Sequence, residues 1–195
     1  MMTPTTGGAV HEQQRRRDDQ MLYLMIKPDP EAAAAMDKLR LHYGLARKYA
    51  AERFHITLVP FGDIRLISPE NLDLIRRAVA SLQVEPFEVA LRRIRGNALV
   101  GNRMQPLLDF QRALVARLQA FGVEIPDYVF EPHASLTYEA WQQRNIVVPP
   151  IAWRVQEVLL INSIHGKGHD LLASWPLKPR QGLLDFGPTS AGARG

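Results

Sequence analysis

A short motif that occurs twice constrains this chain more than any other feature. His55-Ile56-Thr57-Leu58 returns 78 positions later as His133-Ala134-Ser135-Leu136. On an extended strand, side chains two positions apart share a face and neighbours point to opposite faces. Each motif therefore presents a histidine and a hydroxyl on one side and turns two apolar side chains to the other. We expect the apolar pairs to be buried and the two imidazole–hydroxyl pairs to be accessible.

The surroundings of the two motifs repeat as well. Gly44 and Gly122 each stand 11 positions before the histidine of their motif, and each follows a segment with helical periodicity. At the same offset Tyr43 corresponds to Phe121 and Met36 to Leu114. The pattern indicates a diverged internal duplication of helix, loop and strand, in which each half supplies one His-x-hydroxyl pair.

Composition predicts an ordinary soluble globular protein. The 195 residues are 46% hydrophobic and 23% charged, enough for one domain with a real core. We expect that domain over residues 21–178, with mobile tails over 1–20 and 179–195. The absence of cysteine excludes disulfides, thiolate nucleophiles and zinc–thiolate sites. Without a leader-like or long apolar run, the expected location is the cytoplasm, with no membrane contact.

The positive charge is concentrated in one segment. The formal net charge is +4, and residues 87–103 hold four arginines, at 92, 93, 95 and 103, against Glu88 alone. A basic stripe within the folded body suits a polyanion such as RNA. A solvated strand face is an equally good interpretation.

Hydrophobic periodicity and capping signals define the expected elements. Helices are predicted over about 30–43, 69–82 and 106–121; Asp29-Pro30 and Ser68-Pro69 are typical starts for the first two. Strands are predicted over 22–26, 54–61, 87–94, 98–100, around His133, and over 153–161 and 171–177. Pro149-Pro150 is expected to end a loop, and Gly166-Lys167-Gly168 to form a hairpin turn.

These elements predict an α+β fold. Sequential strands are close enough for antiparallel pairing, so we expect two antiparallel sheets side by side, related by a pseudo-two-fold axis, with helices on the outer faces. The two histidine strands would face each other across a central cleft between two lobes.

Two histidines at one small site suit general acid–base chemistry. Imidazole has an ordinary pKa of about 6.5, so one ring can be neutral while the other is protonated. In-line displacement at phosphorus needs such a pair, with a base for the attacking oxygen and an acid for the departing one. Thr57 and Ser135 would donate hydrogen bonds to the non-bridging phosphate oxygens. This chemistry needs no metal and no cofactor.

The motifs HITL and HASL resemble the paired His-x-Thr/Ser motifs of the two-histidine (2H) phosphoesterases, in particular the 2'-5' RNA ligase and RNA cyclic phosphodiesterase branch. The similarity extends over about 22–177 and includes KPDP after the first strand and WRVQEVLLINS near the end. The resemblance implies a bilobal fold, His55 and His133 as the acid–base pair, and Thr57 and Ser135 as phosphate ligands. It implies activity on 2',3'-cyclic phosphates of RNA ends or nucleotides, or on 2'-5' linkages. Thr137-Tyr138-Glu139 replaces a basic residue of some relatives, which favours the cyclic phosphodiesterase over the ligase.

Several assignments have structural alternatives. Phe61 and Tyr138 are candidates for stacking on a base, and Lys27 and Arg53 for adding positive charge at the cleft, with packing or surface placement as the alternative for each. His165, His169 and Asp170 are predicted to be solvent-exposed hairpin residues, not metal ligands. The expected partners are RNA ends or small cyclic or 2'-5' nucleotides, and no obligate protein partner is expected of what should be a monomer. The alternative function is a non-catalytic RNA- or nucleotide-binding module that retains the cleft.

Overall fold

A computed structural model describes residues 20–45, 50–102, 104–138, 144–165 and 167–178. The helices are α2 (Pro30–His42), α3 (Pro69–Ala80) and α4 (Gln105–Ala120), with short 3₁₀ turns at Ala51–Arg53 and Ile64–Leu66. The strands are β1 (Gln20–Ile26), β2 (Ile56–Asp63), β3 (Phe87–Arg95), β4 (Ala98–Val100), β5 (His133–Ser135), β6 (Asn145–Val155), β7 (Glu157–Ile164) and β8 (Gly168–Pro176).

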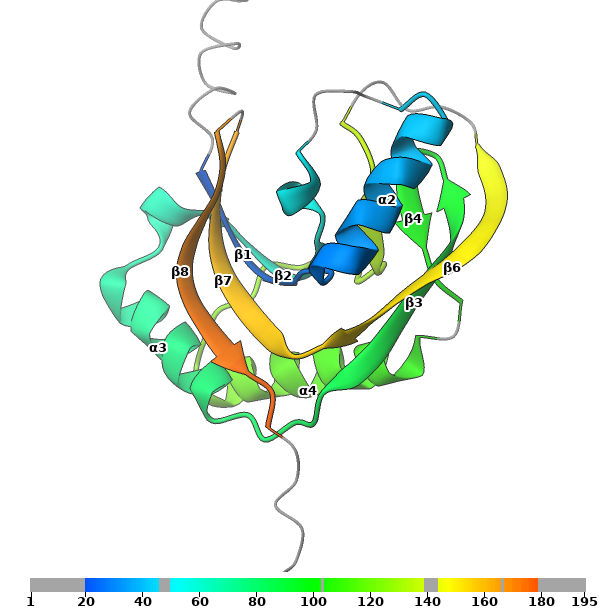
Figure 1. The fold of residues 1–195 in the computed structure, drawn as a ribbon. Helices are drawn as coiled ribbons and strands as arrows, with labels where there is room; N and C mark the ends of the chain where they lie inside the picture. Colours follow the sequence, from blue (N-terminus) through cyan, green and yellow to red (C-terminus); the bar gives the residue numbers. More distant parts are fainter. Residues whose placement is uncertain (1–19, 46–49, 103, 139–143, 166, 179–195) are drawn as a thin grey trace, which may run out of the picture.

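The strands form two four-stranded antiparallel sheets, as predicted. One sheet has the order β2-β1-β7-β8 and the other β5-β4-β3-β6 (Figure 1). The histidine strands β2 and β5 each occupy an edge, and these two edges are in contact. The sheets match strand for strand, with β2, β1, β7 and β8 corresponding to β5, β4, β3 and β6. The bilobal α+β fold expected from the sequence is therefore confirmed.

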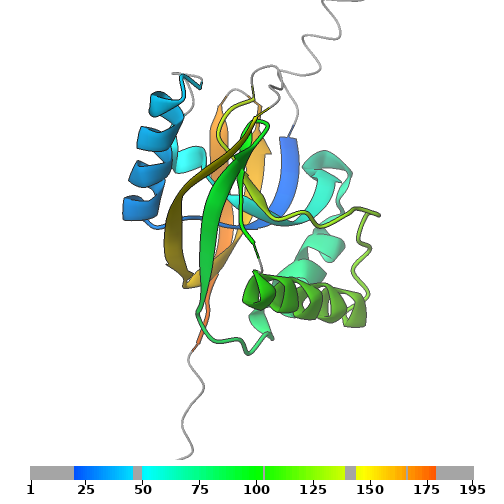
Figure 2. The ribbon, with the colours of Figure 1, turned by 90° about the vertical axis from the view of Figure 1, so that its right-hand side faces the viewer.

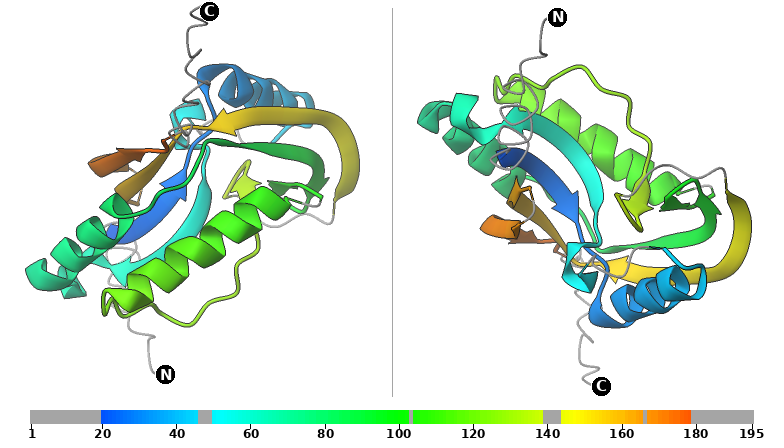
Figure 3. Two further views of the ribbon diagram at one scale, coloured as in Figure 1. Left: turned by 90° about the horizontal axis from the view of Figure 1, so that it is seen from below. Right: turned by 90° about the horizontal axis from the view of Figure 1, so that it is seen from above.

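The helices lie on both sides of the strands. α2 contacts β6, whereas α4 contacts β3 and α3, so α2 is separated from the other two helices by the sheets (Figures 2 and 3). The predicted caps are present. The Asp29 side chain accepts a hydrogen bond from the Ala32 amide, and the Ser68 hydroxyl accepts one from the Asn71 amide. None of the described helices is long and apolar enough to cross a bilayer.

The ends of the two duplicated helices have the same geometry. Gly44 and Gly122 have φ values of +63° and +78°, and each reverses the chain after its helix. The following amides, of Leu45 and Val123, both donate a 3.0 Å hydrogen bond to a carbonyl five residues earlier. The same closing turn thus precedes each histidine, and it supports the duplication inferred from the sequence.

The core explains why the motifs turn their histidines outward. Ile56, Leu58, Ala134 and Leu136 are all fully buried in one apolar cluster that continues under both sheets. Burying a large aliphatic side chain contributes about 1.5–3 kcal/mol, so this alternation fixes the register of both strands. The residues between them, including Thr57 and Ser135, must then lie on the other face.

Two expectations about the C-terminal strands were wrong. Pro149 and Pro150 lie inside β6, where the register with β3 shifts; β6 is an edge strand, so its prolines need not donate to a neighbour. The single strand predicted over 153–161 is two strands in different sheets. Gln156 separates β6 from β7, and Gln156 and Glu157 are exposed in succession, which interrupts the alternation of the segment.

The predicted tails fall mostly outside the described residues. Gln20, assigned to the N-terminal tail, is described, and it is the first residue of β1. It pairs with Ile164 of β7. The first strand therefore begins one residue before the predicted boundary of the domain.

Gly44→Ala should lower the free energy of unfolding by about 1–2 kcal/mol, the cost of a left-handed conformation for a residue with a Cβ. Among the described residues, and apart from its two chain neighbours, no atom lies within 4 Å of a Cβ built at this position, so the expected loss comes from backbone strain. Chemical denaturation of Gly44→Ala and Gly44→Asn provides the check. Asparagine tolerates positive φ and should be milder; equal stability of the alanine variant and the parent would contradict the assignment.

Candidate active site

The two histidines stand at the start of the two facing strands. His55 is the residue immediately before β2, and His133 is the first residue of β5. Because these edges meet, the two imidazoles are close enough for the charge of His133 to lower the pKa of His55. The sequence therefore brings both rings to one place, from positions 78 residues apart.

Each ring is held by the same hydrogen bond. Nδ1 of His55 lies 2.7 Å from the Arg53 carbonyl oxygen, and Nδ1 of His133 lies 2.7 Å from the Glu131 carbonyl oxygen. A carbonyl oxygen can only accept, so Nδ1 carries the proton in both rings. In the neutral ring, Nε2 then holds a lone pair and can accept a proton; in the protonated ring, the same atom can donate one. Both histidines thus present the reactive nitrogen away from the backbone.

The two hydroxyls share the faces of their histidines. Thr57 is half-buried and pairs with Met25 of β1, and Ser135 is half-buried and pairs with Ala98 of β4. Both are separated from the histidine by one buried residue, which leaves histidine and hydroxyl on the same side. The pairs predicted from the motifs are therefore present as pairs. Their action on phosphate stays a prediction.

His55 is held in its neutral form by its surroundings. Burial lowers its pKa below the ordinary value of 6.5, and only the hydrogen bond to the Arg53 carbonyl opposes this. The nearby positive charges of Lys27, His133 and Arg53 lower the pKa further. His133, by contrast, is exposed to solvent. The duplicated motifs thus supply two rings of the same tautomer in unlike environments.

Lys27 and Arg53 lie beside His55, as their effect on its pKa requires. The Lys27 ammonium donates a 2.9 Å hydrogen bond to the Glu52 carbonyl oxygen. Burial lowers the pKa of Lys27, and the Glu52 carboxylate partly offsets this. Positive charge is therefore present at this side of the site, and direct contact with a substrate stays a prediction for both residues.

The two aromatic candidates are placed differently. Phe61 is 8% exposed and belongs to the core cluster, which favours the packing alternative, and stacking on a base stays untested for it. Tyr138 is 66% exposed at the end of the segment that follows Ser135. Stacking on a base stays a prediction for Tyr138.

A third histidine, which the sequence placed in solvent, belongs to this site. The rings of His169 and His55 are 5.1 Å apart between centroids and meet edge to face at 78°. Burial, with His55 and Lys27 as further causes, lowers the pKa of His169 to about 3. Its buried Nδ1 has no hydrogen-bond partner among the described residues, which also disfavours the charged ring. His165, in the same hairpin, is exposed as predicted.

The path of β7 and β8 explains this error. Both strands curve strongly, and their hairpin end rises beside the start of β1 (Figure 1). In the sheet, β8 is the edge farthest from β2. Contact between His169 and His55 therefore depends on curvature, which no local sequence pattern encodes.

Within the described residues, no group of three or more His, Asp or Glu side chains is arranged to hold a metal ion. His169 turns its ring toward His55, and Asp170, its neighbour in the sequence, is exposed.

Tyr128 ties the two halves together near the site. The Gln111 amide of α4 donates to the Tyr128 hydroxyl, and this hydroxyl donates to the Leu58 carbonyl of β2, both at 2.7 Å. Leu58 lies on an edge strand, so this bond supplies a partner that a neighbouring strand would otherwise give. The segment leading to His133 is thereby fixed to the strand that follows His55. No sequence signal marks Tyr128, because the bond joins residues 70 positions apart.

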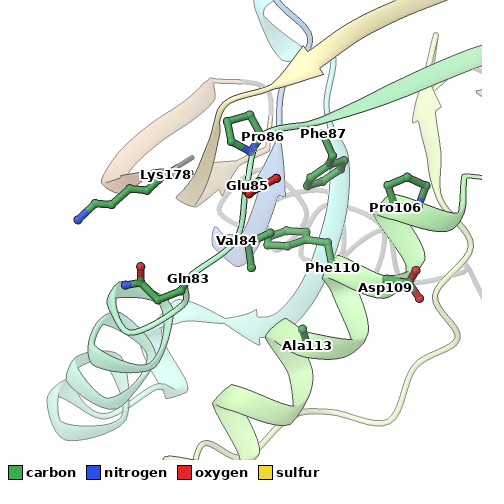
Figure 4. Close-up of a pocket in the computed structure, with 10 residues that line it drawn as sticks. All are labelled: Gln83, Val84, Glu85, Pro86, Phe87, Pro106, Asp109, Phe110, Ala113 and Lys178. Atoms are coloured by element: carbon green, nitrogen blue, oxygen red, sulfur yellow. The ribbon is translucent and has the colours of Figure 1, made fainter. Parts of the chain in front are cut away.

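The pockets differ in their relation to the motifs. A pocket of about 700 Å³ is lined by His133 together with residues of β3 and β4. A larger one, of about 1100 Å³, lies between the segment that leads into β3 and the start of α4 (Figure 4). It is lined by residues such as Phe87, Phe110 and Lys178 and by no residue of either motif. Of these two pockets, only the smaller one includes a motif residue, His133.

Comparison with known proteins identifies the family of this chain. The sequence model of the 2'-5' RNA ligase superfamily matches residues 28–166, which include both motifs. The chain belongs to the 2'-5' RNA ligase superfamily. The resemblance of its motifs to those of the 2H phosphoesterases is therefore confirmed. No curated protein sequence matches the chain.

Solved structures share the fold at low sequence identity. The Escherichia coli LigT complexed with 3'-AMP has a TM-score of 0.66 at 20% identity, over 82% of this chain and 99% of LigT. A structure described as a phosphoesterase gives 0.66 at 20% identity, over 83% and 100%. The protein TT0787 of Thermus thermophilus gives 0.64 at 19% identity, over 80% and 97%. This superfamily member therefore has the LigT fold over nearly the whole length of its structural relatives.

His169→Ala should raise the pKa of His55 toward 6.5, because it removes the ring that shields His55 from water. NMR titration of the histidine ring resonances measures the shift directly and needs no substrate. His165→Ala is the matched control, since it removes an exposed histidine from the same hairpin. An unchanged His55 titration in His169→Ala would show that the ring contact does not determine its ionisation.

Proposed function

We propose that this protein is a metal-independent phosphodiesterase that opens 2',3'-cyclic phosphates of RNA ends or nucleotides, and that it acts on 2'-5' linkages by the same chemistry. The observation that carries the proposal is the pair of Nδ1–carbonyl hydrogen bonds. Because these bonds occupy Nδ1, Nε2 is the nitrogen of each ring that can exchange a proton with a substrate. The contact between β2 and β5 supports a common site for the two rings. Membership of the superfamily supports phosphoester chemistry. The reported complexes of LigT with 3'-AMP, phosphate and ATP support a nucleotide or phosphate ligand.

The environments of the two rings favour different roles. His55, with its lowered pKa, is neutral at pH 7 and is suited to take a proton from water. His133 is exposed to solvent and is the second ring of the pair, so it is left to give the proton. We assign His55 as the base and His133 as the acid in hydrolysis. In the reverse direction, which would form a linkage, the two roles exchange.

The reaction is a single in-line displacement. Water attacks phosphorus and gives its proton to Nε2 of His55 while the bond from phosphorus to the ribose 3'-oxygen breaks. Nε2–H of His133 protonates that 3'-oxygen, and the product is a 2'-phosphate. Thr57 and Ser135 donate hydrogen bonds to the non-bridging oxygens, where negative charge accumulates in the transition state.

His55→Ala and His133→Ala should each lower kcat on a 2',3'-cyclic nucleotide by about 10²–10⁴-fold, the usual contribution of a general acid or base. The assay is run with excess chelator, and His42→Ala, on α2, serves as the control. Full activity in either variant, or complete loss in the chelated parent protein, would overturn the mechanism. Nucleotide binding without turnover in the parent would instead favour the binding-module alternative.

The leaving group separates the two roles. A phosphodiester that releases p-nitrophenolate does not need a proton donor, so the defect of His133→Ala should shrink strongly on this substrate, whereas that of His55→Ala should persist. For each variant, the ratio of its kcat/KM to that of the parent protein is measured on this substrate and on a cyclic nucleotide, and the two ratios are compared. The opposite pattern would exchange the assignments of acid and base.

The pH dependence should be bell-shaped, with an acidic limb below pH 6.5. The base must be neutral, and the pKa of His55 is lowered from its ordinary value, so activity is retained as the pH falls and is lost only once His55 gains a proton. A kcat/KM profile across the acidic and alkaline ranges tests this. An acidic limb above pH 6.5 would contradict the assignment of His55 as the base.

A further inference from the structure

The two motif residues of β5 share cross-strand rows with two arginines. Val100 of β4 pairs with His133 on one side and with Arg93 of β3 on the other. Ala98 pairs in the same way with Ser135 and Arg95. Directly opposed residues of antiparallel strands point to the same face. Arg93 and Arg95 therefore lie on the face that carries His133 and Ser135.

The pocket supports this common face. His133, Arg93 and Arg95 all line the volume of about 700 Å³, as do Phe130 and Glu131. Arg93 is half-buried, and its Nη1 donates a 2.7 Å hydrogen bond to Oδ1 of Asn145, which holds the guanidinium in place. A guanidinium has five N–H donors, so several remain for a ligand. Glu131 is the one acidic side chain among the described lining residues.

The spacing suits an anion beyond the reacting phosphate. Neighbouring strands are about 4.8 Å apart, so each arginine backbone is about 10 Å from its partner in the motif, too far for the two backbones to share one phosphate. Paired guanidinium groups are well matched to phosphate oxygens. A mononucleotide bound between the two histidines would leave this part of the pocket without a phosphate.

We propose that Arg93 and Arg95 form a second phosphate subsite, which binds the phosphodiester that precedes the reacting cyclic phosphate. The inference rests on the proposed function and narrows it, since the preferred substrate is then the end of an oligonucleotide and not a free cyclic nucleotide. The subsite explains why the arginines stand in the rows of His133 and Ser135.

The first test compares kcat/KM for two substrates, uridine 2',3'-cyclic phosphate and the dinucleotide UpU with a 2',3'-cyclic end. The parent protein should prefer the dinucleotide about ten- to a hundredfold, the effect of one or more charge-assisted hydrogen bonds. In the double variant Arg93→Gln/Arg95→Gln, this ratio should fall toward one. The salt dependence of KM for the dinucleotide should also become shallower by about 0.7 in the log–log slope, the value for one phosphate of a single strand.

Arg92→Gln is the matched control. Arg92 is an exposed arginine of the same strand that does not line the pocket, so its loss removes the same charge from β3. The substrate ratio should not change in this variant. The subsite would be overturned if the parent protein showed no preference for the dinucleotide or if the double variant kept that preference. An equal fall of the substrate ratio in Arg92→Gln would overturn it as well.

A binding measurement keeps the subsite separate from turnover. The affinities of UpU 3'-phosphate and uridine 3'-phosphate are measured by calorimetry for the same three proteins. If no cyclic substrate is opened, the proposed function fails, and the subsite is then judged by the affinity ratio alone. Equal affinity of the parent protein for both ligands would overturn it.

Discussion

The burial of two apolar pairs determines the geometry of the site. Ile56 and Leu58 in β2, and Ala134 and Leu136 at β5, have no exposed surface, and the free energy of their burial holds each strand in one register. A slip by one residue would bury a histidine and a hydroxyl and expose two apolar side chains. The open faces of both motifs are therefore a consequence of core packing. Because β2 and β5 are the edges at which the two sheets meet, the same packing brings the imidazoles together.

Duplication gives the candidate site its symmetry, and the surroundings of the two rings make them unequal. Both rings donate Nδ1–H to a carbonyl two residues earlier, so they begin as the same tautomer. His55 has a third histidine against its ring and two cationic side chains nearby. His133 instead borders a pocket with two arginines. The surroundings of the two rings thus differ through neighbours that the duplication does not share.

Sequence predicted what is local or periodic. The caps at Asp29 and Ser68, the turns at Gly44 and Gly122, and the buried faces of the motifs all depend on patterns a few residues long. Prediction from the sequence failed where the structure depends on which strand forms the edge of a sheet or on how strongly a strand curves. Pro149 and Pro150 are tolerated within β6 because β6 is an edge strand. His169 contacts the ring of His55 because β7 and β8 are strongly curved. Tyr128 was missed for the same reason, since its bond to Leu58 spans 70 positions. The roles of the site residues remain predictions, now with defined neighbours.

The basic stripe illustrates how sheet register adds meaning to composition. From sequence alone, the arginines of residues 87–103 suited RNA and a solvated strand face equally well. Strand pairing distinguishes the arginines from one another. Arg93 and Arg95 share cross-strand rows with His133 and Ser135 and line the pocket beside His133, whereas Arg92 does not line that pocket. The alignment is what a phosphodiester chain requires, because its charges recur at a fixed spacing along one strand. The sheet that positions His133 and Ser135 therefore also places Arg93 and Arg95 on the same face, as the proposed second phosphate subsite requires.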